Sequence, residues 1–419
     1  MSSTTAADRS MPPAPGWPTG PERRLRVGVA GLGRAFTLML PTLIADARVE
    51  LVAAADPRAE ATVRFAREFG GRVYRTVEAM CADPEVDVVY VATPHQWHAD
   101  HVEVAAAGGK HVLVEKPMAI TLDECRRMIA ASERANVRLV VGHSHSFDAP
   151  ILRARAIIAS GALGAVRMIN AQYYTDFLYR PRRPEELDTT RGGGAVFSQA
   201  AHQVDIVRLL GGGRVRSVRA QTGAWDPARA TEGAYAALLA FEDGSYASLA
   251  YSGYAHFDGD ELCGGIDEMG AQKADAYVGA ARRNLRHAAN PEEEAALKNA
   301  RNYGGADYDA AVNAERARPP PSHQHFGLVL VCCERGDLRP MPHGVMIYGD
   351  GEKHLEPLPK PRVPRAEVID ELYAAIVSGR TPVHGGRWAL ATLEVCLAML
   401  QSAREQRDIV LDHQVAVSS

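Results

Sequence analysis

Short runs of β-branched residues alternate with helical stretches over residues 25–142, and this alternation constrains the fold more than any other feature of the sequence. Strands that alternate with helices form βαβ units, and right-handed crossovers build them into a parallel sheet covered on both faces. We therefore predict a doubly wound Rossmann-type α/β domain over residues 23–145. The expected strands are 26–30, 49–56, 72–75, 86–93, 111–115 and 138–142, and the expected helices are 34–45, 59–69, 99–107 and 122–135.

The pattern changes after residue 144, where strand-like runs dominate. We predict an α+β domain over residues 146–360 with a large, mostly antiparallel sheet, in which Glu242 to Ser245 forms a hairpin turn. An insertion rich in Ala, Glu and Arg is expected at 258–321, partly helical between Pro291 and Arg301. Residues 361–419 should form C-terminal helices that pack back on the core. The expected elements of this half are helices 151–160, 367–378 and 388–405, and strands 166–174, 215–222, 234–241, 246–251, 345–348 and 409–411.

Composition excludes several classes of partner. The net charge is -4, so a basic surface for nucleic acid or an anionic membrane is not expected. No apolar run reaches the length of a membrane span, and residues 1–22 have the composition of a disordered leader. The six cysteines include no CxxC pair and no metal-ligand spacing, so we expect no metal. Free buried thiols are typical of the reducing cytoplasm, where we expect this protein.

A glycine-rich turn follows the first expected strand and opens the first helix. Gly31 permits the tight turn, and Gly33 lets a pyrophosphate approach the backbone N–H groups at the helix N-terminus. Arg34 and Ala35 begin that helix and are predicted cofactor contacts. A plain strand–helix turn is the alternative, and a third glycine of the usual fingerprint is absent.

An acidic residue ends the second expected strand, 25 residues after Gly31. Asp56 would accept hydrogen bonds from an adenosine ribose and repel a 2′-phosphate, which favours NAD. Arg58 lies close enough to neutralise such a phosphate or stack on adenine, so NADP stays open. The alternative for Asp56 is a helix N-cap before Pro57.

Two further strand ends carry polar residues. Thr93, Pro94, His95 and His98 follow the fourth strand, where a loop would pass under a nicotinamide, although a proline-initiated turn with solvated histidines gives the same pattern. Lys116 ends the fifth strand. A desolvated lysine near a cationic nicotinamide has a lowered pKa and suits a general base, whereas the alternative is a snorkelling strand-end lysine.

A triple glycine, Gly192 to Gly194, leads into an expected amphipathic helix that carries His202. Glycines let a helix approach another element closely. A lone helical histidine is most often structural. Because a glycine-opened cleft would bring it near Lys116, we predict a substrate-binding or acid–base role for His202.

These stretches together resemble the Gfo/Idh/MocA oxidoreductase family. The resemblance covers roughly residues 26–205 and the region 388–411. It implies a Rossmann domain, an open antiparallel C-terminal sheet through which a homodimer or homotetramer forms, Lys116 as catalytic lysine and His202 as substrate-handling residue. Glu115 joins Lys116 among the implied cofactor contacts. The motifs that carry the resemblance are residues 30–33, 55–58, 91–94, 114–117 and 192–202.

One position departs from the family pattern. Sugar and inositol dehydrogenases of the family usually carry an Asp four residues before the histidine, and this chain has Ser198 there. A polyol substrate is therefore disfavoured. A finer resemblance, carried by residues 31–37, 323–327, 339–342 and 391–397, is to the phthalate 4,5-cis-dihydrodiol dehydrogenase branch of the family.

An arginine-rich loop precedes the triple glycine. Arginine binds carboxylates bidentately, so this loop fits an anionic substrate, although a solvated basic loop paired with nearby glutamates is the alternative. With Ser198 and His202, the predicted substrate residues are Tyr173, Arg180, Arg182, Arg183 and Arg191.

The sequence thus predicts an NAD(P)-dependent dehydrogenase acting on CH–OH or CH–CH donors. Lys116 would take the proton of a carbinol while hydride passes to the nicotinamide. The expected substrate is a small anionic aromatic cis-dihydrodiol of the phthalate type, oxidised to a catechol. The alternatives are a polyol, inositol or sugar-acid dehydrogenase, and a regulator that senses NAD(P) without turnover.

Overall fold

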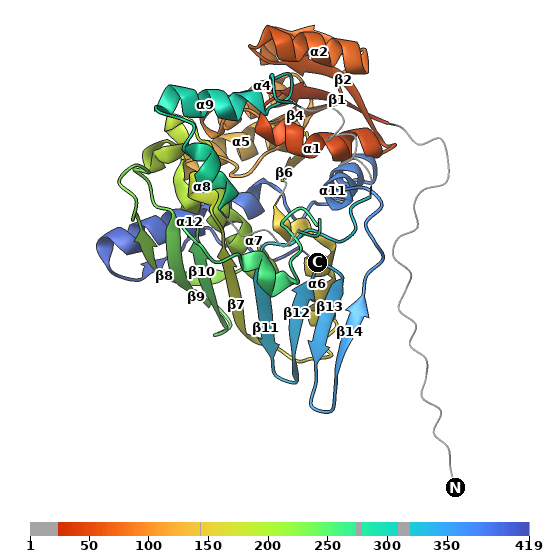
Figure 1. Cartoon of the computed structure of the whole chain (residues 1–419). Coiled ribbons are helices and arrows are strands. Elements are labelled where there is room, and N and C mark those ends of the chain that lie inside the picture. Colours follow the sequence, from red (N-terminus) through yellow and green to blue (C-terminus); the bar gives the residue numbers. More distant parts are fainter. Residues whose placement is uncertain (1–23, 143, 274–278, 309–318, 419) are drawn as a thin grey trace.

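The computed structural model describes residues 24–142, 144–273, 279–308 and 319–418. The predicted leader over residues 1–22 lies outside these ranges, as do parts of the predicted insertion. Two sheets organise the described chain, with helices between and around them (Figure 1).

The first sheet is the predicted parallel one. Its strand order is β3-β2-β1-β4-β5-β6, and every pair of neighbours is parallel. The order reverses between β1 and β4, the switch point at which open α/β sheets bind ligands. The strands are β1 (Leu25–Ala30), β2 (Val49–Ala55), β3 (Arg72–Tyr74), β4 (Val88–Val91), β5 (His111–Val114) and β6 (Leu139–Val141).

Helices cover both faces of this sheet, and local capping explains where two of them begin. Thr121 precedes α5, and its hydroxyl accepts from the Glu124 N–H while the Glu124 carboxylate accepts from the Thr121 N–H. Thr76 caps α3, a short helix that the sequence analysis missed. The helices are α1 (Arg34–Ala45), α2 (Ala59–Phe69), α3 (Val77–Cys81), α4 (His98–Ala107) and α5 (Leu122–Arg134).

The second sheet is mostly antiparallel, as predicted, with the order β14-β13-β12-β11-β7-β10-β9-β8-β15. Only β7 and β10 pair in parallel among its described strands. The predicted hairpin joins β9 to β10. The strands are β7 (Val166–Tyr174), β8 (Val215–Gly223), β9 (Ala234–Phe241), β10 (Tyr246–Ser252), β11 (Leu328–Cys333), β12 (Gly336–Met341), β13 (Gly344–Tyr348), β14 (Lys353–Pro357) and β15 (Ile409–Val410).

Three of these strands, β11, β12 and β14, were not predicted. Pro340 lies inside β12, and β14 is a polar edge strand, so neither shows the alternation of a half-buried strand. The strands β11 to β14 pair successively through short antiparallel hairpins, and β11 also pairs with the distant strand β7.

Four helices join the two sheets. The helix α6 (Ala149–Ala159) packs on β12 and β13, α7 (Ala201–Leu210) on β7, and α12 (Gly386–Glu405) on β8, α5 and α7. The helix α11 (Ala366–Val377) adds Val368, Ile369 and Leu372 to the core of the Rossmann domain. The α7 helix was predicted to be amphipathic, but all ten of its residues are buried because other elements surround it.

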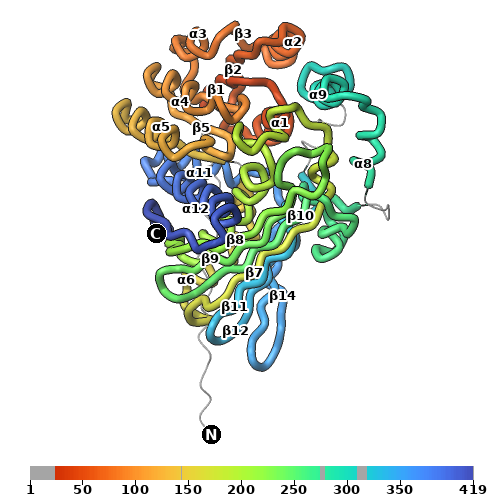
Figure 2. The backbone as a smooth tube through the Cα atoms, turned by 90° about the vertical axis from the view of Figure 1, so that its left-hand side faces the viewer, coloured from red at the N-terminus to blue at the C-terminus, as the bar shows by residue number. Residues whose placement is uncertain are grey.

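The described part of the insertion contains α8 (Ala280–Leu285) and the predicted helix α9 (Pro291–Ala300). Asn290 caps α9, and Figure 2 shows this helix beside the Rossmann domain. Tyr303 follows it and is fully buried against Phe36, with ring centroids 5.2 Å apart. Within the described ranges, no helix is both long and apolar enough to cross a membrane.

Candidate active site

The glycine turn lies between β1 and α1 at the switch point. Gly31 has a φ of +91°, and a Cβ there would lie 3.0 Å from the Ala92 carbonyl oxygen, so the turn itself requires glycine. Gly33 has an ordinary φ of -81°, and a Cβ there would have no heavy atom within 4 Å. Packing within the chain therefore does not require a glycine at position 33. A pyrophosphate approaching the N-terminus of α1, where Arg34 and Ala35 begin the helix, supplies such a requirement and fits this turn.

Asp56 ends β2 beside this turn and is buried. One carboxylate oxygen accepts from the Leu32 N–H at 2.7 Å, and the other accepts from the Arg58 N–H at 2.8 Å. The helix N-cap is Arg58, so Asp56 is not the cap. The Arg58 guanidinium also donates to the carbonyls of Leu32 at 2.8 Å and Tyr303 at 3.3 Å. A 2′-phosphate would have to displace these bonds, and this arrangement fits NAD.

The His98 side chain fixes the loop that follows β4. Its ring nitrogens lie 2.9 Å from the Thr93 carbonyl oxygen and 3.0 Å from that of Pro117, and the side chain is fully buried. His98 thus ties the β4 loop to the β5 loop. His95 lies nearer the glycine run, with Nδ1 3.2 Å from the Gly192 carbonyl oxygen, and burial lowers its pKa to about 3. Cofactor contacts by Thr93, Pro94, His95 and His98 stay predictions.

Lys116 reaches from the end of β5 to the helix that carries His202. Its Nζ donates to the Ser198 carbonyl oxygen at 2.9 Å, and burial lowers its pKa. Ser198 lies in a π-helical turn, Val196–Ala200, of the kind often found at functional sites. Glu115 points away from this contact, because its carboxylate is buried and accepts from the Tyr90 hydroxyl at 2.5 Å. We therefore assign Glu115 a structural role, and its predicted cofactor contact is not supported by this geometry.

His202 lies one helical turn after Ser198, in α7. Its Nδ1 accepts from the His145 backbone N–H at 3.4 Å. A neutral ring with an acceptor at Nδ1 carries its proton on Nε2, so His202 is assigned as an N–H donor. Its ring packs between His145 and Phe326, at centroid distances of 4.8 and 4.7 Å.

A charged group that the sequence analysis missed adjoins His202. His145 is buried, with Nδ1 2.7 Å from the Asp148 carboxylate and Nε2 3.3 Å from that of Glu268. Burial alone would lower the pKa of His145, but the two carboxylates raise it to about 9. Burial would likewise raise the pKa of Glu268, but His145, Arg180 and Arg365 lower it to about 2. His145 lies four residues after the end of the last strand of the Rossmann sheet, and that position was the available signal; nothing in the sequence indicates Glu268.

The four arginines of the predicted loop differ in their surroundings. The Arg180 side chain is 47% exposed, and its two ion-pair neighbours, Asp176 and Glu268, lie 3.8 and 4.0 Å away, beyond hydrogen-bond distance. Arg182 is largely buried over the Phe177 ring, 3.7 Å from its centroid. Arg183 pairs with glutamates 185 and 186, and Arg191 is exposed. Among the described residues, the Arg180 guanidinium therefore makes no hydrogen bond, and Glu268 is one of its two ion-pair neighbours.

Aromatic side chains form one wall of the site. Phe326 stacks parallel to Tyr251, with an interplanar angle of 4°, and also contacts Tyr173 and His202. The Tyr173 hydroxyl donates to Asp260 at 2.8 Å and is buried. The Tyr173 hydroxyl is therefore already engaged, and the predicted substrate contact of Tyr173 stays a prediction.

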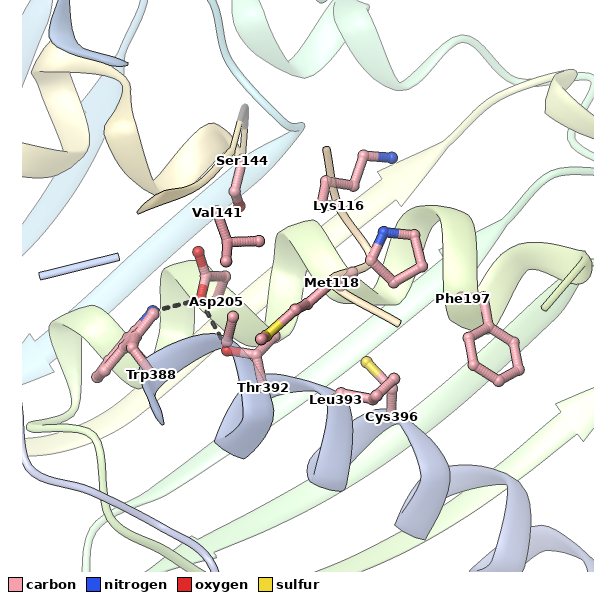
Figure 3. A pocket seen from close by; sticks show the side chains of 13 residues that line it. Lys116, Met118, Val141, Ser144, Phe197, Asp205, Trp388, Thr392, Leu393 and Cys396 are labelled. Carbon is pink, nitrogen blue, oxygen red and sulfur yellow. Dashed lines mark hydrogen bonds between the residues drawn. The ribbon is translucent and has the colours of Figure 1, made fainter. Parts of the chain in front are cut away.

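A small cavity lies between α7, α12 and the β5 and β6 loops, and Lys116 is among its lining residues. Its walls are mostly apolar, and His202, Arg180 and Glu268 do not line it. The Asp205 carboxylate accepts hydrogen bonds from Trp388 at 2.6 Å and from Thr392 at 2.7 Å. In Figure 3 the Lys116 ammonium points away from these three side chains. The Lys116 ammonium is therefore directed away from the polar end of this cavity.

Comparisons with known proteins agree with this geometry. Residues 25–143 match the model of the oxidoreductase family with an NAD-binding Rossmann fold, GFO_IDH_MocA, and residues 151–263 match the GFO/IDH/MocA C-terminal domain. Over 383 residues the chain is 48% identical to the 1-carboxy-3-chloro-3,4-dihydroxycyclohexa-1,5-diene dehydrogenase of Comamonas testosteroni. That similarity covers 91% of this chain and 96% of the relative.

Solved structures agree as well. A crystal structure from Bordetella bronchiseptica RB50 is 42% identical with a TM-score of 0.85, covering 93% of this chain and all of that one. The WlbA dehydrogenase of Bordetella pertussis, solved with NADH and UDP-GlcNAcA, is 22% identical with a TM-score of 0.64, covers 93% of this chain and 99% of its own, and shares the fold. The chain therefore belongs to the Gfo/Idh/MocA oxidoreductase family and is an NAD-dependent dehydrogenase.

Proposed function

We propose that this dehydrogenase oxidises a small anionic aromatic cis-dihydrodiol, and that its product becomes a catechol. The observation that carries this proposal is Arg180, a half-exposed guanidinium without a hydrogen-bond partner in the described chain, next to an aromatic wall. Such a pair suits a flat ring that bears a carboxylate. The Comamonas relative, whose name describes a carboxylated dihydroxycyclohexadiene, supports the same substrate class.

The residues have separate roles in the proposed reaction. NAD, when bound, supplies the hydride acceptor. Lys116 takes the proton from the carbinol oxygen, and its bond to the Ser198 carbonyl at 2.9 Å orients the amine toward His202. His202 donates from Nε2 to the same oxygen and holds the substrate. The carbinol carbon loses hydride, the oxygen loses its proton, and a ketone results. The neighbouring ring C–H proton then moves to that oxygen, which gives the catechol.

The arginines provide the test. Arg180→Ala should raise KM for a cis-dihydrodiol of benzoate by about ten- to a hundredfold, the value of a charge-assisted hydrogen bond. The kcat should change less, because a remote carboxylate is bound alike in the ground and transition states. Arg183→Ala is the matched control, since Glu185 and Glu186 already pair with that arginine. An unchanged KM in Arg180→Ala would refute the anionic substrate.

The same kinetic assay tests the alternative of a polyol substrate. Ser198 leaves no carboxylate four residues before His202. We therefore expect myo-inositol and glucose to be poor substrates. Efficient turnover of either one would favour the polyol alternative.

The second sheet supports a further proposal, a homodimer or homotetramer formed through its outer face. Leu238 and Tyr246 are 49% and 43% exposed there, and Leu238 pairs in register with Ser248. An extended row of apolar and small side chains is typical of a subunit interface. Sedimentation velocity of Leu238→Asp tests it, because a charge in this row should release monomers. The free cysteines favour a cytoplasmic location.

A further inference from the structure

Glu268 brings a carboxylate from the insertion to the rim of the site, and the proposed reaction does not use it. Its side chain is 26% exposed. One oxygen lies 3.3 Å from His145 Nε2, and the other lies 4.0 Å from Arg180 Nη1. These two cations, with Arg365, hold the pKa of Glu268 at about 2 against the effect of burial. Glu268 is therefore an anion at every pH at which the enzyme would work.

A tight turn fixes this carboxylate in place. The Asp267 side chain accepts from the N–H groups of Met269 and Ala271, each at 2.9 Å. The preceding residue, Ile266, is buried, and its carbonyl oxygen lies 2.8 Å from His325 Nε2. Hydrogen bonds of the residues before and after Glu268 thus fix its backbone.

The charges around Glu268 allow one substrate carboxylate but not two. A first carboxylate can pair with Arg180, whose N–H groups make no hydrogen bond to the described residues. Carboxylates on neighbouring ring carbons lie side by side, and the Arg180 and Glu268 charged groups are only 4.0 Å apart. A second carboxylate beside the first would therefore meet Glu268, and like charges in contact are repelled strongly.

We propose that Glu268 occupies the position of a second substrate carboxylate and restricts the site to dihydrodiols that carry one. Glu268 is in this view a specificity-determining residue. The proposal rests on the proposed function, because it requires Arg180 as the anchor of the first carboxylate. It excludes a doubly charged phthalate dihydrodiol as the preferred substrate.

Binding of two stable aromatic acids tests this without turnover. Benzoate carries one carboxylate and phthalate carries two on neighbouring carbons. Calorimetric titration of the NAD-saturated enzyme should show benzoate binding at least about tenfold tighter than phthalate. Glu268→Gln removes the charge and keeps the shape, and it should tighten phthalate binding by about tenfold or more while benzoate changes little.

Two variants serve as controls. Glu268→Asp keeps the charge and should retain the preference for benzoate, and Glu261→Gln removes an exposed carboxylate of the same insertion and should behave like the wild type. Equal binding of the two acids by the wild type, or no gain of phthalate binding in Glu268→Gln, would overturn the inference. Those results leave the proposed function intact if Arg180→Ala still weakens benzoate. Failure of the wild type to bind either acid would instead overturn both.

Discussion

The two glycines of the β1–α1 turn should separate folding from cofactor binding. Gly31→Ala places a side chain at a φ of +91° and 3.0 Å from the Ala92 carbonyl oxygen. A left-handed conformation costs a non-glycine residue roughly 1–2 kcal/mol, so this variant should lose about 2 kcal/mol of unfolding free energy. Gly33→Ala meets no atom within 4 Å and keeps an ordinary φ. It should cost at most about 1 kcal/mol, the difference between these residues at an N-cap.

NAD affinity, in contrast to folding stability, should be the property that Gly33→Ala changes. The added methyl group of Gly33→Ala stands where the pyrophosphate must approach the N–H groups of α1. Losing one charge-assisted hydrogen bond there weakens NAD binding by about ten- to a hundredfold. Urea unfolding and fluorescence titration with NAD measure the two effects on the same samples. Wild-type NAD affinity in Gly33→Ala would refute the placement of the pyrophosphate over Gly33.

Three further predictions follow from other parts of the site. NADP should bind more weakly than NAD because Asp56 faces the ribose and the Arg58 fork is engaged; tighter NADP binding in a fluorescence titration would contradict this. Lys116→Met should keep NAD affinity and lower kcat by about 10²–10⁴-fold, and a variant with most of its turnover would remove Lys116 from the mechanism. His145 has a pKa of about 9 against about 6.5 when unfolded, so its stabilisation is full below pH 6.5 and is lost as pH rises through 9. The loss should reach about 3 kcal/mol in urea unfolding, and His145→Gln should flatten that dependence if the assignment is right.

Local patterns were sufficient to predict the fold class and to propose Lys116 and His202 as catalytic residues. The strands of the Rossmann domain are short β-branched runs between amphipathic helices, and the turn at Gly31 and the lysine at the end of β5 follow from that periodicity. Lys116 and His202 were found because they lie at a strand end and after a glycine run. Both signals are contained within a few residues of sequence.

The residues that we propose to recognise the substrate could not be singled out in the same way. Four arginines of one loop have similar sequence surroundings, and the ion pairs that each one makes in the folded chain separate them. Arg183 is occupied by Glu185 and Glu186, whereas Arg180 is left facing the site. Glu268 is separated from Lys116 by more than 150 residues of sequence, and no motif marks it. Distance in the chain applies to β11, which pairs with β7, whereas β12 and β14 were missed because Pro340 interrupts β12 and β14 is a polar edge strand.

The insertion contacts both the proposed substrate side and the cofactor side of the molecule. Glu268, in its first part, stands beside Arg180. Tyr303, in its second part, is buried in the Rossmann core, where its N–H donates to the Thr37 hydroxyl at 3.0 Å and its own hydroxyl donates to Glu68 at 2.8 Å. Its carbonyl oxygen also accepts from Arg58 at 3.3 Å. The insertion thus helps to hold the arginine that could otherwise bind a 2′-phosphate. We therefore expect the predicted preference for NAD to depend on Tyr303 and the packing of the insertion as well as on Asp56, although sequence reasoning assigned it to Asp56 alone.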